Sequence, residues 1–220
     1  MKHHKRFPLV LIALTALASG SLYAENWKVG EKWAYQHQGP RPYSDGSATV
    51  KGDRTMELTA IRGDGDQKRY LLRNTWGTED ANPSTSHIDA KNMIRKIEIQ
   101  DMGVLAFEPP VPVFWSLNVG EEKDLTTQVD FVGFALAIEY KAKRLADESL
   151  TVPAGAFKDC WHVQVVSTMR SDMMPATSSK MDYWYHPSVK NFVKEVIVTN
   201  YQGDNGYTAT SVLKSHTKKN

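Results

Sequence analysis

Four methionines lie close together in the C-terminal half of the chain, at positions 169, 173, 174 and 181. Thioethers are ligands for Cu(I), and a thiol and two imidazoles occur nearby. A soft-metal site could therefore be built from Met169, Met173, Met174, His162, His186 and Cys160. We favour another interpretation, in which the methionines line an adaptable apolar surface, because repeated Met-x-x-Met spacing is missing.

Cys160 and His162 form a second candidate group, since residues two apart on a strand point to one face. That placement suits a metal pair or a nucleophilic dyad. No third partner is evident, and Cys160 is the one cysteine of the chain, so we expect it to be buried as a small apolar residue. The sequence contains no Gly-x-Ser-x-Gly, His-Glu-x-x-His or phosphate-binding glycine loop. We therefore predict no catalytic residues and no cofactor.

Aromatic residues are the third group, with six Trp and nine Tyr in the chain. Some predicted strands are apolar on both faces, as around Val196 and Ile197. Such a sheet needs a ligand, a helix or a partner on its second face, unless two sheets pack as a sandwich. The candidate ligand-binding residues are Trp161, Tyr183, Trp184 and Tyr185.

The elements that must position these residues are strands, because apolar residues alternate with a period of two. The clearest are residues 54–61, 69–76, 92–100, 157–168, 192–201 and 207–216. Strand 157–168 is expected to place Phe157, Trp161 and Val165 on one face. Segment 134–147 contains helix-forming alanines, but its alternation favours a strand. About ten strands predict a mainly β fold: a curved antiparallel sheet, half-barrel or roll with little helix.

One segment resists the strand interpretation. Residues 108–113 contain three prolines, which remove three donors from any hydrogen-bonded ladder. We therefore expect no central strand there. Residues 25–220 should form a single β-rich domain, in which this proline-rich segment connects two halves of the sheet.

The N-terminus has the layout of a secretory signal peptide. A basic stretch with Lys2, Lys5 and Arg6 precedes an apolar run over residues 9–17. The run is shorter than the roughly 20 residues that span a bilayer, so we predict a signal peptide over residues 1–24, cut after Ala24. Removing three of 27 basic residues leaves 24 against 25 acidic ones, a charge of −1. We expect a periplasmic or secreted protein with no membrane span and no nucleic-acid partner.

Three short motifs resemble a known family. They are Val29-Gly30-Glu31-Lys32-Trp33, residues 151–160, which contain Val-Pro-Ala-Gly-Ala-Phe, and residues 183–194, which begin Tyr-Trp-Tyr-His-Pro-Ser-Val. Their order resembles exported bacterial β-proteins of the TapB-like kind, whose activity is unknown. Where those relatives have glycine after the valine, this chain has Lys190-Asn191, and we expect Asn191 to take the positive-φ position. The resemblance implies a curved antiparallel sheet similar to the half-barrels of periplasmic lipoprotein carriers, and no catalytic residues.

The export signal, the β pattern and the two-faced strands together favour a non-enzymatic binding or carrier module. Its partner would be an apolar or envelope-derived small molecule, or an envelope protein. Two alternatives stay open. One is copper handling through the region from Met169 to Met181, and the other is an enzyme whose site has no recognisable motif.

Overall fold

The computed structural model describes residues 27–39, 50–77, 83–131, 134–171, 174–199 and 206–219. The predicted signal peptide and Met173 lie outside these residues. The described strands are β1 (Lys32–Gly39), β2 (Val50–Arg62), β3 (Arg69–Trp76), β4 (Ser84–Asp89), β5 (Met93–Ile99), β6 (Gly103–Pro112), β7 (Glu122–Phe131), β8 (Phe134–Arg144), β9 (Glu148–Val152), β10 (Gly155–Ser171), β11 (Met174–His186), β12 (Asn191–Thr199) and β13 (Tyr207–Thr217). No helix in these parts of the chain is long and apolar enough to cross a bilayer.

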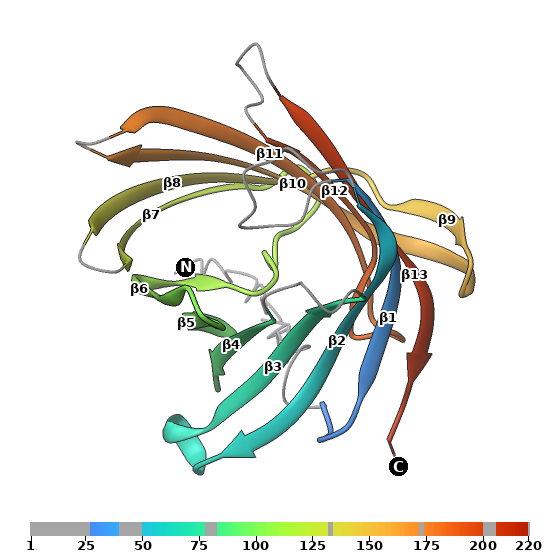
Figure 1. The fold of residues 1–220 in the computed structure, drawn as a ribbon. Coiled ribbons are helices and arrows are strands. Elements are labelled where there is room, and N and C mark those ends of the chain that lie inside the picture. Colours follow the sequence, from blue (N-terminus) through green and yellow to red (C-terminus); the bar gives the residue numbers. More distant parts are fainter. Residues whose placement is uncertain are drawn as a thin grey trace, which may run out of the picture.

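The strands form one antiparallel sheet that closes on itself (Figure 1). Consecutive strands pair from β1 to β8, β8 pairs with β10, and β10 pairs with β11. The ring then continues through β12 and β13 back to β1. β9 stands outside the ring and pairs only with the first residues of β10. The predicted mainly β fold with little helix is confirmed, including the strand after residue 134, and the β10–β11 pairing closes the sheet into a barrel.

The proline-rich segment differs from the prediction, because it is the second half of strand β6. β6 pairs with β5 as far as Pro112, but with β7 only from Leu105 to Glu108. The β7 ladder thus ends where the prolines begin, since proline has no N–H to donate. The hydroxyl of Thr127 on β7 donates instead to the carbonyl of Pro109, at 2.6 Å. Prolines are accommodated here because only one side of the strand is paired.

A bulge near the start of β10 changes which residues share a face. The register with β9 shifts between Phe157 and Cys160, and Asp159 has a φ of 55°. Phe157 pairs with Leu150 and Cys160 with Glu148, two residues apart on β9, so Phe157 shares a face with Cys160. The prediction that Phe157 lies on the face of Trp161 is therefore wrong, because the extra residue of the bulge reverses the alternation.

Two of the sequence motifs meet at the turn between β11 and β12. Trp33 donates from Nε1 to the carbonyl of Val189 at 2.7 Å, and Trp27 donates to that of Lys190 at 3.1 Å. Lys190, with a φ of 58°, takes the left-handed conformation that we expected at Asn191. Asn191 is instead fully buried and accepts the amide of Phe192 on Oδ1. Lys190, directly after Val189, therefore supplies the left-handed residue of this turn.

Candidate functional site

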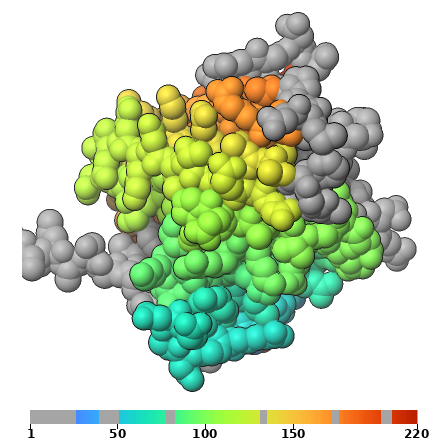
Figure 2. All heavy atoms as spheres, turned by 90° about the vertical axis from the view of Figure 1, so that its left-hand side faces the viewer, coloured from blue at the N-terminus to red at the C-terminus, as the bar shows by residue number. Residues whose placement is uncertain are grey.

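A cavity of about 560 Å³ lies among strands β5 to β8, β10 and β11. Its walls carry large apolar side chains that are only half-buried because they face open space: Ile97, Leu105, Phe107, Ile138, Met169 and Met181. The volume falls in the range of roughly 300–1,000 Å³ typical of small-molecule sites. Figure 2 shows the side of the barrel formed by these strands, coloured from green through yellow to orange.

The cavity is lined by apolar and aromatic residues, with no charged side chain. The lining residues that carry a hydroxyl are Tyr140 and Tyr183. The hydroxyl of Tyr183 already accepts the backbone N–H of Trp115, at 2.7 Å. A charged group placed here would lose its hydration without a compensating partner, which costs several kcal/mol. The site therefore suits an apolar molecule or the apolar part of an amphiphile.

The segment between β6 and β7 runs through the barrel interior and bounds the cavity (Figure 1). Val113 and Trp115 line the cavity, and Phe114, Trp115 and Leu117 are buried. The Phe114 ring lies 4.9 Å from the ring of Tyr185, between centroids. Tyr185 is buried but does not line the cavity. The segment thus separates the hollow region from a packed one.

The packed region of the interior contains a buried ion pair. Arg54 of β2 contacts Glu195 of β12 at 2.5 Å, although β13 and β1 lie between these strands in the sheet. The two side chains therefore meet across the interior. Arg54 also donates to Asn74 Oδ1 at 3.0 Å and lies 4.9 Å from the ring centroid of Trp76. The buried guanidinium of Arg54 thus has a carboxylate, an amide oxygen and an aromatic ring as partners.

The four predicted ligand-binding residues occupy three different environments. Tyr183 lines the cavity. Trp161 and Tyr185 lie beyond the crossing segment, with ring centroids 5.3 Å apart, and the guanidinium of Arg144 covers Trp161 at 4.4 Å. Trp184 alternates with Tyr183 and Tyr185 on β11, so it faces the outside of the barrel. Whether these residues bind a ligand stays a prediction.

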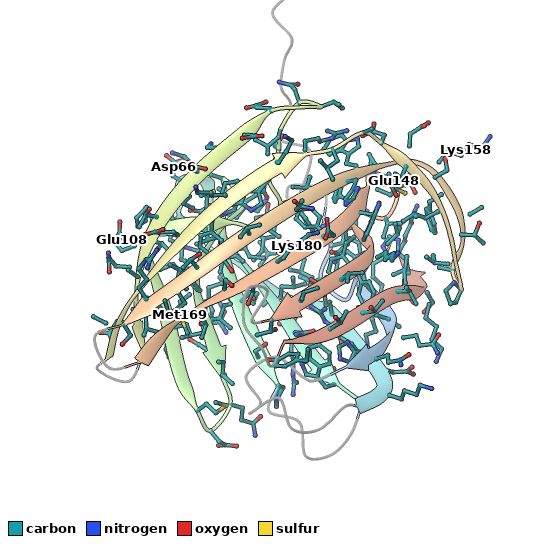
Figure 3. All side chains as sticks on the ribbon, turned by 90° about the horizontal axis from the view of Figure 1, so that it is seen from above. Asp66, Glu108, Glu148, Lys158, Met169 and Lys180 are labelled. Atoms are coloured by element: carbon teal, nitrogen blue, oxygen red, sulfur yellow. The ribbon has the colours of Figure 1, made fainter. Side chains whose placement is uncertain are left out.

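The proposed soft-metal ligands are also dispersed. Met169 and Met181 line the apolar cavity, and Met169 lies near one end of the long β10 strand in Figure 3. The side chain of Met174 lies outside the described residues, as Met173 does. Within the described ranges, no group of three or more His, Cys, Asp or Glu side chains could hold a metal ion. His186 accepts the hydroxyl of Ser188 on Nδ1, at 2.8 Å, within its own turn.

His162 lies between two carboxylates on the outer face of the barrel. Its Nδ1 is 2.8 Å from Glu148 Oε1 and its Nε2 is 3.0 Å from Asp182 Oδ1, while its ring stacks on Trp184. Burial lowers the pKa of His162, but the two carboxylate hydrogen bonds outweigh burial, so the pKa is raised. Because both ring nitrogens are occupied by different carboxylates, His162 acts as a structural link between β9, β10 and β11.

Cys160 is fully buried, as predicted, at a position of β10 that pairs with Glu148 of β9. Burial raises the pKa of its thiol to about 11, and the nearby carboxylates of Asp147, Asp159 and Glu148 add to this effect. A thiolate is the nucleophilic form of cysteine, and it is strongly disfavoured here. The environment of Cys160 therefore supports packing rather than nucleophilic chemistry.

Most of the cavity wall was not among the predicted site residues. Ile97 and Ile99 on β5 alternate with polar residues, and Leu136, Ile138 and Tyr140 recur at every second position of β8, as expected for residues that face inward. The same alternation would appear if the interior were completely packed. No signal in a single sequence distinguishes a filled barrel from a hollow one.

Comparisons with known proteins show the fold. No family model matches the sequence, and no curated protein matches it. A solved structure from Parabacteroides distasonis, described as a "putative lipoprotein", has a TM-score of 0.52 and 13% identity, covering 86% of this chain and 96% of its own. A second, from Bacteroides fragilis and described as a "putative exported protein with YmcC-like fold", has a TM-score of 0.50 and 13% identity, covering 87% and 97%. The chain therefore shares a barrel fold with these proteins.

Proposed function

We propose that this chain is an exported periplasmic binding or carrier protein that holds the apolar part of an envelope-derived molecule inside its barrel. The observation that carries the proposal is the apolar cavity of about 560 Å³. The N-terminal signal pattern supports export, and the fold shared with proteins described as exported or as a lipoprotein agrees with it. The TapB-like resemblance is compatible with the same location.

The energetics of the cavity favour such a ligand. Each methylene group transferred from water into an apolar site contributes about 0.8 kcal/mol, or about fourfold in Kd. Ten methylenes would contribute about 8 kcal/mol, from which the cost of immobilising the ligand must be subtracted. The three flexible methionines of the wall, Met102, Met169 and Met181, can adapt to more than one chain shape.

The experiment is a titration of refolded, ligand-free protein with the fluorescent fatty acid cis-parinarate. We expect saturable binding that palmitate displaces. Val165 is buried and lines the cavity, so Val165→Phe should weaken binding at least tenfold by occupying the space of two or more methylenes.

The matched control is Val104→Phe, which introduces the same side chain on a residue that is 42% exposed on β6. This variant should bind as the wild type does. Absence of saturable binding, or equal weakening by both substitutions, would show that the cavity is not the site.

A further inference from the structure

The lining of the cavity stops partway along three neighbouring strands, at Tyr140 of β8, Val165 of β10 and Tyr183 of β11. On β8, Leu136, Ile138 and Tyr140 line it, whereas Ala142 does not. On β10 the lining stops at Val165, before Val163, and on β11 it stops at Tyr183, before Tyr185. Ala142, Val163 and Tyr185, the next inward-facing residues, are all buried, at 2%, 1% and 1% exposure, so the interior beyond the last lining residues is packed.

Trp115, from the segment that crosses the interior, contacts two of these last lining residues, Tyr140 and Tyr183. It is 4% exposed and lines the cavity, and its ring lies 6.3 Å from that of Tyr140, between centroids. Its backbone N–H is fixed by the hydroxyl of Tyr183. Phe114, its neighbour in the chain, packs against Tyr185, which does not line the cavity. Trp115 is therefore fixed by contacts with two strands, β8 and β11.

We infer that Trp115 is the floor of the cavity and sets the length of apolar chain that the protein accepts. This inference rests on the proposed function and names its specificity-determining residue. The lining has no charged group, so an amphiphile must enter with its apolar tail first and leave its polar end outside. A linear chain entering in this way advances until its terminal methyl group meets the indole of Trp115.

The limit should be visible in a series of saturated fatty acids from octanoate to stearate. Below the limit, each added methylene should tighten binding about fourfold. Beyond it, further methylenes stay in water and the affinity should level off. Trp115→Ala should move this plateau to longer chains, so that the first acids beyond the wild-type limit bind at least tenfold tighter to the variant.

Two further variants serve as a milder substitution and as a control. Trp115→Phe keeps an aromatic floor of smaller size and should give an intermediate plateau if the alanine variant does not fold. Trp161→Ala removes an equally large side chain that lies beyond the floor and does not line the cavity, so the plateau should stay at the wild-type length.

The outcomes separate the two proposals. If the wild type binds no fatty acid, both the proposed function and the floor are wrong. If the wild type binds but Trp115→Ala and Trp115→Phe keep its plateau, or if Trp161→Ala moves it equally, only the assignment of Trp115 is wrong.

Discussion

Two valines on strand β10 provide a direct test of the hollow interior. Val163 and Val165 are both buried, at 1% and 2% exposure, and both point inward. Val165 lines the cavity and Val163 does not. The same substitution, valine to phenylalanine, should therefore enter open space at one position and a packed core at the other.

The expected difference can be worked from burial alone. Phenylalanine at position 165 gains about 1 kcal/mol of additional apolar burial and loses part of it in rotamer freedom, so stability should stay equal or rise by up to about 1 kcal/mol. Phenylalanine at position 163 overfills a packed site, which costs about 1–3 kcal/mol. A gap of about 2 kcal/mol between the variants corresponds to about 4–8 °C in Tm for a chain of this size.

The assay is equilibrium urea unfolding followed by tryptophan fluorescence, with Tm from calorimetry. The protein should first be unfolded and refolded without ligand, because a bound ligand would stabilise the wild type by mass action. If Val165→Phe loses as much stability as Val163→Phe, the space beside Val165 is already filled, and the account of a hollow barrel fails.

Three further predictions concern buried polar groups. Glu195→Ala should lower the free energy of unfolding by about 3–5 kcal/mol, since it leaves the charge of Arg54 buried and unpaired. The double variant Arg54→Met/Glu195→Leu should recover most of this loss in urea unfolding. A loss below about 1 kcal/mol for Glu195→Ala would show that the pair is not buried. The raised pKa of His162 means that its protonated form contributes stability fully below pH 6.5, and that this contribution disappears as pH rises through the folded-state pKa. Burial lowers the pKa of His216, so protonation of His216 in the same pH range destabilises the fold, which is the opposite effect. His162→Gln should therefore remove only the fall of Tm with rising pH, and an unchanged Tm–pH profile would refute the assignment. Cys160 should resist iodoacetamide at pH 8 in the native state and react fully in urea, whereas rapid native labelling would contradict its burial.

The strand pattern could be predicted from the sequence because it depends on local alternation. The returning strand at residues 69–76 has the predicted limits, and residues 134–144 form a strand despite their alanines. The burial of Cys160 was predicted on a different ground, because the one cysteine of the chain has no partner and packs as a small apolar residue. Local errors arose where one residue changes the geometry: the bulge at Asp159 reversed the face of Phe157, and Lys190 rather than Asn191 took the left-handed position.

Contacts between residues far apart in the chain, and the cavity that they enclose, could not be predicted from the sequence, for physical reasons. The contact between Arg54 and Glu195 joins residues 141 positions apart, and the β10–β11 pairing that closes the barrel could equally have left an open sheet. The cavity depends on how the volume enclosed by the strands compares with the volume of the side chains inside. A single sequence gives the second quantity but not the first.

The central claim, that the barrel carries an apolar molecule, is tested most directly by native mass spectrometry of the protein purified without detergent from the cells in which it occurs naturally. We predict an added mass on the folded protein, identified as an apolar or amphiphilic compound by organic extraction. The added mass should be lost on unfolding, reduced in Val165→Phe and retained in Val104→Phe. A wild-type protein that carries no added mass and acquires none after incubation with envelope lipid extract would contradict the claim.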